Sequence, residues 1–267
     1  MTPPPEHAVI SSSANPAIAS VRSLTRRDTR AAERAFVVEG LRAVRDGLLA
    51  GGRPRLLLLR QDARAEHLLD ELGVSPDDPA LRRVEPRLFD RLSEVQAPQG
   101  VLAVFPWPDI PVPASATPLV LVLDRLRDPG NLGTLLRSAA GAGVSAVYLT
   151  PESVDPWNPK VVRAGMGAHF RLPLLAFDAA AAAVLRGLPL RVAAAADAPA
   201  PYDAVDWTQP AALIIGGEAE GISPHLTAWA SETVAIPMAG QVESLNAAVA
   251  GSVLLFEAAR QRRLERP

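Results

Sequence analysis

The sequence Ile236-Pro-Met-Ala-Gly-Gln-Val-Glu-Ser-Leu-Asn246 decides the fold, because it joins the end of a strand to the start of an apolar helix. The strand must stop at Pro237, since proline has no N–H to donate to a sheet. A polar loop follows, and Ser244 is the expected N-cap of a helix that is apolar on nearly every side up to Phe256. Such a helix has to be buried. Ligands of α/β proteins bind where strands end, so this junction is a predicted ligand site.

The strand before this junction is the last of a series of apolar runs in the second half of the chain. Helical patterns separate most of these runs, as parallel βαβ units require. We therefore predict an α/β domain with a mostly parallel, six-stranded sheet and helices on both faces. The predicted strands are residues 119–123, 146–150, 172–177, 190–194, 212–215 and 233–236.

The first half of the chain is predicted to be a smaller α/β domain. Its apolar runs at residues 36–38, 56–59 and 101–105 alternate with helical patterns at residues 40–50 and 86–95. Five prolines between Phe105 and Pro118 predict an extended linker, and the start of the chain lacks periodicity, which predicts a flexible tail. The expected boundaries are a tail at 1–13, a first domain at 14–105, a linker at 106–118 and a second domain at 119–267.

Composition excludes several classes of protein. The 267 residues include no cysteine and four scattered histidines, so we expect no disulfide and no metal site. No apolar stretch is long enough to span a membrane and the start does not resemble a signal peptide, so a cytoplasmic protein is expected. The net charge is -2, yet the segment from Arg22 to Arg64 contains eleven arginines and only five acidic residues. This region is either a phosphate-binding surface or a solvated arginine-rich face.

A glycine-rich segment, Asp128-Pro-Gly-Asn-Leu-Gly-Thr-Leu-Leu-Arg137, lies between the first two strands of the second half. Asn131 is the expected helix cap, and Arg137 lies off the apolar stripe, one turn after Gly133, whose missing side chain leaves room for a substrate. Taken alone, the segment is explained better by a helix cap with a surface arginine. A dinucleotide site is disfavoured, because the spacing is not G-x-G-x-x-G. The residues expected to pack on the sheet are Leu132, Leu135, Leu136, Ala139 and Ala140.

Two further segments carry candidate functional residues. The loop Gly216-Gly-Glu-Ala-Glu-Gly221 places Glu218 where glycines let the backbone approach a ligand. Ser223 is the expected N-cap of the next helix, followed by proline at its first position. Lys160 and Arg163 begin another helix and are either two cations at the same sheet edge or solvated charges.

Together these segments resemble a known family. In order and spacing, the segments containing Asn131 to Arg137, Gly216 to Gly221 and Ile236 to Asn246 resemble the three motifs of the SpoU (TrmH) family of RNA ribose methyltransferases. The first half is similar to that family's amino-terminal substrate-binding domain through Asn15-Pro16, an arginine cluster and Phe36-Val-Val-Glu-Gly40. The resemblance covers the whole second half, about 150 residues.

The resemblance implies a fold, a cofactor and a set of site residues. The carboxyl-terminal segment would thread a loop to form a trefoil knot, the first domain would be ribosomal-protein-like, and the protein would be a homodimer whose sites are shared between subunits. The cofactor would be S-adenosylmethionine and the substrate RNA, ribosomal rather than transfer RNA. The implied catalytic residues are Asn131, Arg137, Glu218, Ser244 and Asn246. The implied cofactor contacts are Thr150, Gly216, Gly221, Ile236, Met238 and Leu245. The implied RNA contacts are Arg26, Arg27, Arg30, Lys160 and Arg163.

The implied reaction needs help in removing a proton from a weakly acidic ribose hydroxyl. Because a guanidinium stays protonated in proteins, Arg137 is expected to bind the target phosphate and stabilise the developing alkoxide. The proton would leave to water, phosphate or Glu218. The alternatives are the same chemistry on transfer RNA, methylation of a base, a non-catalytic RNA-binding relative and a nucleotide-binding dehydrogenase.

Overall fold

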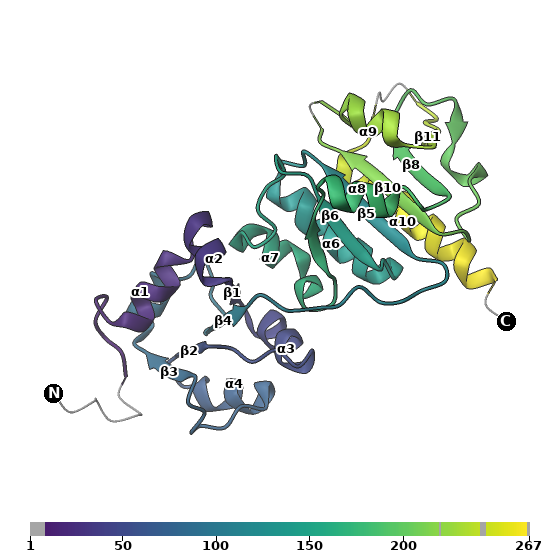
Figure 1. Cartoon of the computed structure of the whole chain (residues 1–267). Helices are drawn as coiled ribbons and strands as arrows, with labels where there is room; N and C mark the ends of the chain where they lie inside the picture. The colour runs from purple at the N-terminus through teal and green to yellow at the C-terminus, as the bar shows by residue number, and fades with distance from the viewer. Residues whose placement is uncertain (1–8, 219, 241–243, 266–267) are drawn as a thin grey trace. The chain divides into compact units, whose positions relative to one another are not determined.

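The computed structural model describes residues 9–218, 220–240 and 244–265 and divides the chain into two compact units (Figure 1). Unit 1 consists of Met1–Pro108 and Trp157–Phe170, and unit 2 of Asp109–Pro156 and Arg171–Pro267. The segment Trp157–Phe170 belongs by sequence position to the second predicted domain, but it packs with the first.

A four-stranded sheet lies at the centre of unit 1. The strand order is β1-β4-β2-β3, with β1 and β2 antiparallel to β4, and β2 parallel to β3. The sequence predicted three of these strands and missed β3, whose residues Leu81-Arg-Arg-Val84 include just two apolar side chains. The strands are β1 (Ala35–Glu39), β2 (Leu56–Arg60), β3 (Leu81–Val84) and β4 (Val101–Pro106).

Short helices surround this sheet. Ile10, within the predicted tail, is buried and forms a bridge to Val84, while residues 1–8 lie outside the described residues. The helical pattern predicted at residues 86–95 forms a helix over its first five residues alone. The helices are α1 (Pro16–Ser23), α2 (Arg27–Glu33), α3 (Leu41–Leu49), α4 (Ala65–Leu72), α5 (Pro86–Asp90), α7 (Pro159–Gly165) and the 3-10 turn η1 (Ala168–Phe170).

An aromatic cluster explains why α7 and η1 belong to unit 1. The ring centroid of Phe36 in β1 lies 4.9 Å from that of Trp157, and the ring of Phe105 in β4 lies 4.9 Å from that of Phe170. Gly47 of α3 is required here, because a Cβ atom would lie 2.7 Å from Cζ of Phe170. Burial of these rings supplies the apolar contact that holds residues 157–170 in this unit.

Unit 2 is built on a parallel sheet of seven strands in the order β7-β6-β5-β10-β8-β11-β9. Every neighbouring pair is parallel, as predicted, but there are seven strands rather than six. The additional strand, β9, has two residues and no hydrophobic period that a sequence could reveal. The strands are β5 (Leu119–Asp124), β6 (Ala146–Leu149), β7 (Leu174–Ala176), β8 (Leu190–Ala194), β9 (Ala200–Pro201), β10 (Ala211–Gly216) and β11 (Glu232–Ala235).

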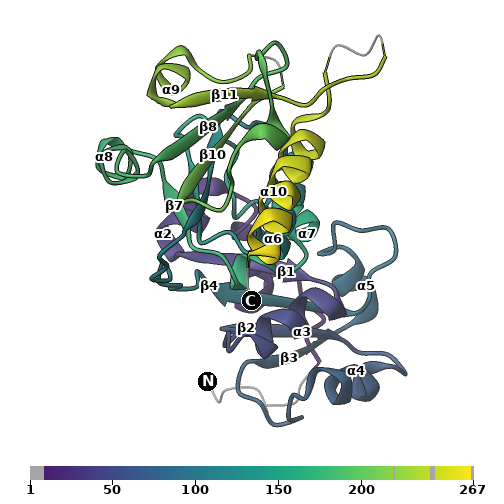
Figure 2. The same ribbon diagram turned by 90° about the vertical axis from the view of Figure 1, so that its right-hand side faces the viewer.

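Helices cover both faces of this sheet (Figure 2). Ala212 and Ile214 of β10 pack in a cluster with Leu185 of α8 and Leu226 of α9. Ile215 points to the other face, where α6 and α10 pack against each other. The helices are α6 (Pro129–Ala142), α8 (Ala179–Leu185), the 3-10 turn η2 (Tyr202–Ala204), α9 (Pro224–Trp229) and α10 (Ala247–Leu264).

Helix α10 is buried along one side, as its composition predicted, but not on every side. Gly251 faces α6 and β10, and a Cβ atom there would lie 2.5 Å from Cδ2 of Leu135. Val249 and Phe256 remain 48% and 52% exposed in the single chain. Among the described residues, no helix is both long and apolar enough to cross a membrane.

Candidate active site

The carboxyl ends of β8, β10 and β11 and the segment before α10 enclose a cavity of about 570 Å³, which we call the large cavity. Five of the six residues predicted to contact the cofactor line it together. They are Gly216, Gly221, Ile236, Met238 and Leu245. Residues 241–243, in the middle of the decisive junction, lie outside the described residues.

Thr150, the sixth residue of that prediction, does not line the large cavity. It is buried, and its hydroxyl oxygen accepts a hydrogen bond of 2.9 Å from the backbone N–H of Arg125. The Arg125 backbone has a φ of 53°, a left-handed conformation that is costly for a residue with a side chain. Thr150 therefore supports the turn after β5, and the prediction that it contacts the cofactor has no support in its position.

The residues of one wall of the large cavity were not predicted from the sequence. Ala193 to Asp197, at the end of β8, and Thr227 of α9 line it. No polar motif marks residues 193–196, which are all alanine. The available signal was position, because the carboxyl end of a neighbouring parallel strand lies at the same sheet edge.

Three predicted catalytic side chains, which we call the Asn-Glu-Asn cluster, meet beside the large cavity. Asn131 of α6 donates from Nδ2 to Oε1 of Glu218. Asn246 also donates from Nδ2 to Oε1 of Glu218, at 2.6 Å, and to Oδ1 of Asn131, at 3.0 Å. These residues come from three segments separated by 87 and 28 positions. Two amide donors thus orient one carboxylate, which is an acceptor in its ionised form.

The helix caps differ from those predicted at two of these positions. Asp128, not Asn131, caps α6, because its carboxylate accepts the backbone N–H of Asn131 at 2.7 Å. Asn246, not Ser244, caps α10, accepting from the N–H groups of Ala248 and Val249. A cap must directly precede the first helical residue, and Ser244 lies two residues too early. Ser244 instead lines the large cavity.

Arg137 lies apart from the cluster. It is exposed on α6, lines neither cavity described here, and makes no hydrogen bond or ion pair with any described residue. Gly133, expected to leave open space beside it, is buried. The predicted stripe is buried at Leu132, Leu135, Leu136 and Ala139 and half-buried at Ala140.

A second cavity of about 340 Å³ lies on the other side of the Glu218 loop. Gly217, Glu218 and Glu220 line both cavities. Asn131 lines only the second cavity, and Asn246 lines only the large cavity. The Asn-Glu-Asn cluster therefore forms part of the wall between the two cavities.

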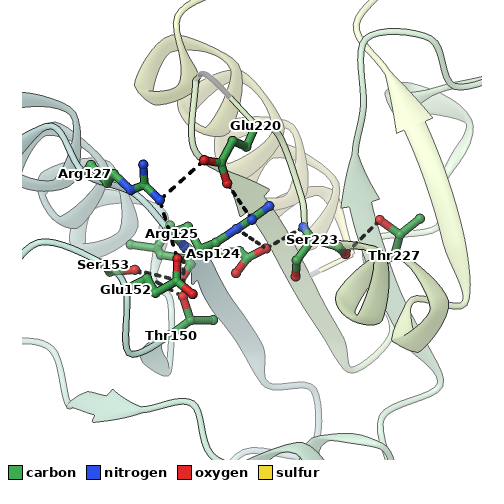
Figure 3. A network of polar contacts seen from close by, with 10 residues as sticks. Asp124, Arg125, Arg127, Thr150, Glu152, Ser153, Glu220, Ser223 and Thr227 are labelled. Atoms are coloured by element: carbon green, nitrogen blue, oxygen red, sulfur yellow. Dashed lines mark hydrogen bonds and ion pairs between the residues drawn. The ribbon is translucent and has the colours of Figure 1, made fainter.

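A polar network holds the loop that carries Glu218 (Figure 3). The buried carboxylate of Asp124, at the end of β5, accepts the backbone N–H of Ser223 at 2.6 Å, and its backbone oxygen accepts from Gly217. Arg125 donates from Nη1 to Oε2 of Glu220 at 2.6 Å. Ser223 starts α9 as predicted, but its side chain makes no capping bond. The network fixes both ends of the loop to β5.

The predicted RNA-binding cations all lie in unit 1, and one of them is structural. Arg30 is buried, and its guanidinium donates to the backbone oxygens of Leu24 and Thr25 at 2.7 and 2.8 Å. These bonds use carbonyls of the turn that follows α1, so Arg30 is not available to RNA. Arg26 and Arg27 are exposed.

The other two predicted cations lie on α7. Lys160 is exposed, and Arg163 forms an ion pair of 3.7 Å with Glu94. Because α7 packs on β1, these residues are part of unit 1 rather than of the unit 2 sheet edge where they were expected. Within the described residues, no group of three His, Asp or Glu side chains could hold a metal ion.

Comparison with known proteins identifies the family. Residues 118–256 match the SpoU rRNA Methylase family. The chain belongs to this family. Residues 15–103 match the MRM3-like substrate binding domain, so the SpoU member has both parts that its sequence predicted.

Named relatives cover both units of this SpoU family member. The mitochondrial rRNA methyltransferase 3 of Mus musculus is 35% identical over 93% of this chain and 73% of its own length. The 23S rRNA (guanosine(2553)-2'-O)-methyltransferase of Bacillus subtilis is 29% identical over 92% of this chain and 97% of its own. The crystal structure of an AdoMet-bound rRNA methyltransferase from Sinorhizobium meliloti is 30% identical and superposes with a TM-score of 0.83, covering 96% of this chain and 98% of that chain.

The large cavity fits the S-adenosylmethionine that the family uses. Its volume lies within the range of roughly 300–1,000 Å³ typical of small-molecule sites. Ile215, Ile236 and Leu254 supply apolar surface, and Glu218 and Asp197 supply negative charge for a cationic ligand. Gly216 allows two segments of backbone to pass close together in this wall, because a Cβ atom there would overlap the backbone of Gly221.

Proposed function

We propose that this SpoU family member transfers a methyl group from S-adenosylmethionine to the 2'-hydroxyl of a ribose in ribosomal RNA. The observation that carries the proposal is the Asn-Glu-Asn cluster in the wall between two cavities. Methyl transfer needs the methyl carbon and the acceptor oxygen in line and roughly 3–3.5 Å apart, which is possible where the two cavities adjoin at Glu218. The named relatives act on ribosomal RNA, which favours it over transfer RNA.

The cofactor would occupy the large cavity and supply a methyl group on a sulfonium centre. Gly216, Gly221, Ile236, Met238 and Leu245 would hold it, largely through backbone and apolar contacts. Ser244 would face both the cofactor and the RNA, because it is exposed while lining this cavity.

Glu218 is our proposed proton acceptor. Its carboxylate receives two amide hydrogen bonds that orient it, and its remaining lone pairs can accept a ribose hydroxyl. Arg137 would bind the target phosphate and stabilise the developing negative charge on the ribose oxygen. A non-catalytic relative would have no chemical reason to hold Asn131 and Asn246 on the same carboxylate oxygen.

The position of Arg137 supports a shared site in a homodimer. Arg137 and Gly141 are four residues apart, so they share one face of α6. Phe256 of α10, half-exposed, lies against Gly141, since a Cβ atom there would be 3.4 Å from Cζ of the ring. A second copy that covers this apolar face would carry Arg137 to the site of its partner. We propose this arrangement for the homodimer.

The remaining sequence predictions belong to the same proposal. Unit 1 would bind the RNA substrate through cations such as the exposed Arg26, Arg27 and Lys160 and the half-buried Arg163. The carboxyl-terminal segment, residues 236–264, would form the last crossing of a trefoil knot. The protein would act in the cytoplasm, on the ribosomal RNA there.

The direct test uses ribosomal RNA from cells that lack the gene. Purified protein and S-adenosylmethionine carrying a labelled methyl group are added, and ribose methylation is mapped as gaps in an alkaline cleavage ladder. We expect one or a few gaps that are present in normal cells, absent without the gene and restored by the protein. A Glu218→Gln variant, which keeps its size and loses its charge, should restore no methylation. If no methylation depends on the gene, the proposed function is wrong.

A further inference from the structure

Two arginines beside the second cavity converge on one carboxylate. Arg125 donates from Nη1 to Oε2 of Glu220, and Nη2 of Arg127 lies 3.4 Å from Oε1 of the same side chain. Both arginines follow the end of β5 at Asp124, and Glu220 belongs to the loop after β10 (Figure 3). All three line the second cavity.

The geometry resembles the way that two guanidinium groups hold one oxyanion. Each arginine contacts a different carboxylate oxygen, so the pair clamps the group from two sides. The side chains of Glu220 and Arg127 are 48% and 61% exposed, and solvent-exposed ion pairs of this kind contribute little to stability. The side chain of Arg125 is only 20% exposed, so an anion that displaces the Glu220 carboxylate has to take over its contact with Arg125 as well.

The second cavity adjoins the large cavity at Glu218 and can receive an acceptor there. The large cavity, on one side of Glu218, has the volume and lining for the methyl donor, and the second cavity opens on the other side. Asn131 projects into the second cavity and contacts Glu218 there. A ribose presented to Glu218 from this side would bring its phosphodiester to the rim where Arg125 and Arg127 lie.

We propose that the second cavity receives the target nucleotide of the RNA, and that an adjoining phosphodiester takes the place of the Glu220 carboxylate on Arg125 and Arg127. The inference rests on the proposed function and adds the residues that read the RNA backbone at the site. Both anions carry one negative charge, so the exchange leaves the charge between the arginines unchanged. The released Glu220 side chain moves into solvent, on a loop whose Gly221 has a φ of 62°.

The exchange predicts effects of opposite sign for two single variants. Arg127→Ala removes half of the phosphate clamp, so the affinity for RNA should fall about five- to tenfold and the salt dependence of log Kd should lose roughly one unit of slope. Glu220→Gln removes the competing carboxylate, so RNA affinity should rise about two- to fivefold. The affinity for S-adenosylmethionine should change less than about twofold in Arg127→Ala, because Arg127 does not line the large cavity.

Binding is measured at equilibrium with ribosomal RNA purified from cells that lack the gene. S-adenosylhomocysteine is present, so that no methyl transfer occurs. The matched controls are Arg186→Ala and Glu232→Gln, which change the same charges at exposed positions of unit 2 that line neither cavity. Both controls should bind RNA like the wild type.

The outcomes separate this inference from the proposed function. If Glu220→Gln weakens RNA binding, the ion pairs only hold the loop and the exchange is refuted. If Arg127→Ala binds RNA like its control, the phosphate site is refuted while ribose methylation by the wild type stands. A wild type that binds neither S-adenosylmethionine nor ribosomal RNA would overturn both.

Discussion

At the scale of single residues, position in the fold separates side chains that look alike in the sequence. Arg26, Arg27 and Arg30 form one basic cluster in the sequence, yet Arg30 is buried and holds the end of α1. Asn246 directly precedes α10 and caps it, whereas Asn131 lies in the first turn of α6 and does not cap it. Because the side chain of Asn131 does not cap a helix, both its amide nitrogen and its amide oxygen bond with other site residues.

Arg137 carries the first prediction at this scale. Arg137→Ala should lower kcat by about 10²- to 10³-fold, because it removes a donor that stabilises the developing oxyanion. Arg137→Lys should recover only a small part of this, since a point charge does not replace a planar, bidentate group. Single-turnover methyl transfer measures the rates, and thermal unfolding should show an unchanged Tm. Nearly full activity of Arg137→Lys would refute a bidentate role.

Asn246 carries the second prediction, because its two roles can be separated. Asn246→Ser keeps a capping oxygen but is too short to reach Asn131 and Glu218, so stability should be retained while activity falls at least tenfold. Asn246→Ala loses the cap as well and should cost about 1 kcal/mol of unfolding free energy. Urea unfolding and methyl-transfer assays measure the two effects. Full activity of Asn246→Ser would show that Asn246 is only a cap.

At the scale of elements, the site depends on how closely α10 approaches the sheet. Gly251 lies against Leu135 of α6 and Ile215 of β10, next to the strand end that leads into the Glu218 loop. A larger side chain would force α10 away from both. The position of Asn246, five residues earlier in the chain, is set by the same packing.

The prediction for this packing compares two glycines in neighbouring helices. Gly251→Ala should lower the unfolding free energy by about 1–2 kcal/mol, because overpacking outweighs the gain in helix propensity. Gly141→Ala is the control, since its Cβ atom would be 3.4 Å from Phe256 Cζ, an ordinary contact. It should be neutral or stabilising by up to about 1 kcal/mol. Urea denaturation measures both, and equal effects would contradict this packing.

At the scale of the whole molecule, the exposed apolar side chains of α10 and the isolation of Arg137 point to the same assembly. One chain contains the Asn-Glu-Asn cluster, both cavities and the loop that separates them. Its Arg137 lies outside both cavities. In a two-fold dimer each chain would complete the site of the other.

The dimer itself is tested at Phe256. Phe256→Glu should weaken self-association by about thirtyfold or more, as expected when a charge replaces a buried aromatic contact. Sedimentation equilibrium measures the effect. Val184→Glu, at an apolar position of α8 that is 74% exposed, is the control and should leave the oligomeric state unchanged. A wild-type monomer at micromolar concentration would contradict the dimer.

Shared sites make a second prediction for the assembly. Arg137→Ala and Glu218→Gln should each be inactive alone, but an equal mixture allowed to exchange subunits should regain about a quarter of wild-type activity, because half of the dimers would contain one intact site of two. Methyl transfer before and after exchange measures this. No recovery, with heterodimers shown to be present, would place each complete site within one chain.

The sequence by itself determined the parallel α/β domain, its neighbour and the three motifs, because hydrophobic period, proline and glycine act locally. It also predicted Glu218 from a glycine-rich loop after a strand, and Asn246 through the resemblance to the family, as site residues. Only the tertiary structure showed that Asn246 and Glu218 share hydrogen bonds, that Thr150 supports a turn and that residues 157–170 pack with the first unit. These facts depend on contacts between distant segments. Such contacts, rather than neighbours in the chain, decide which side chains are buried and which hydrogen-bond partners they have.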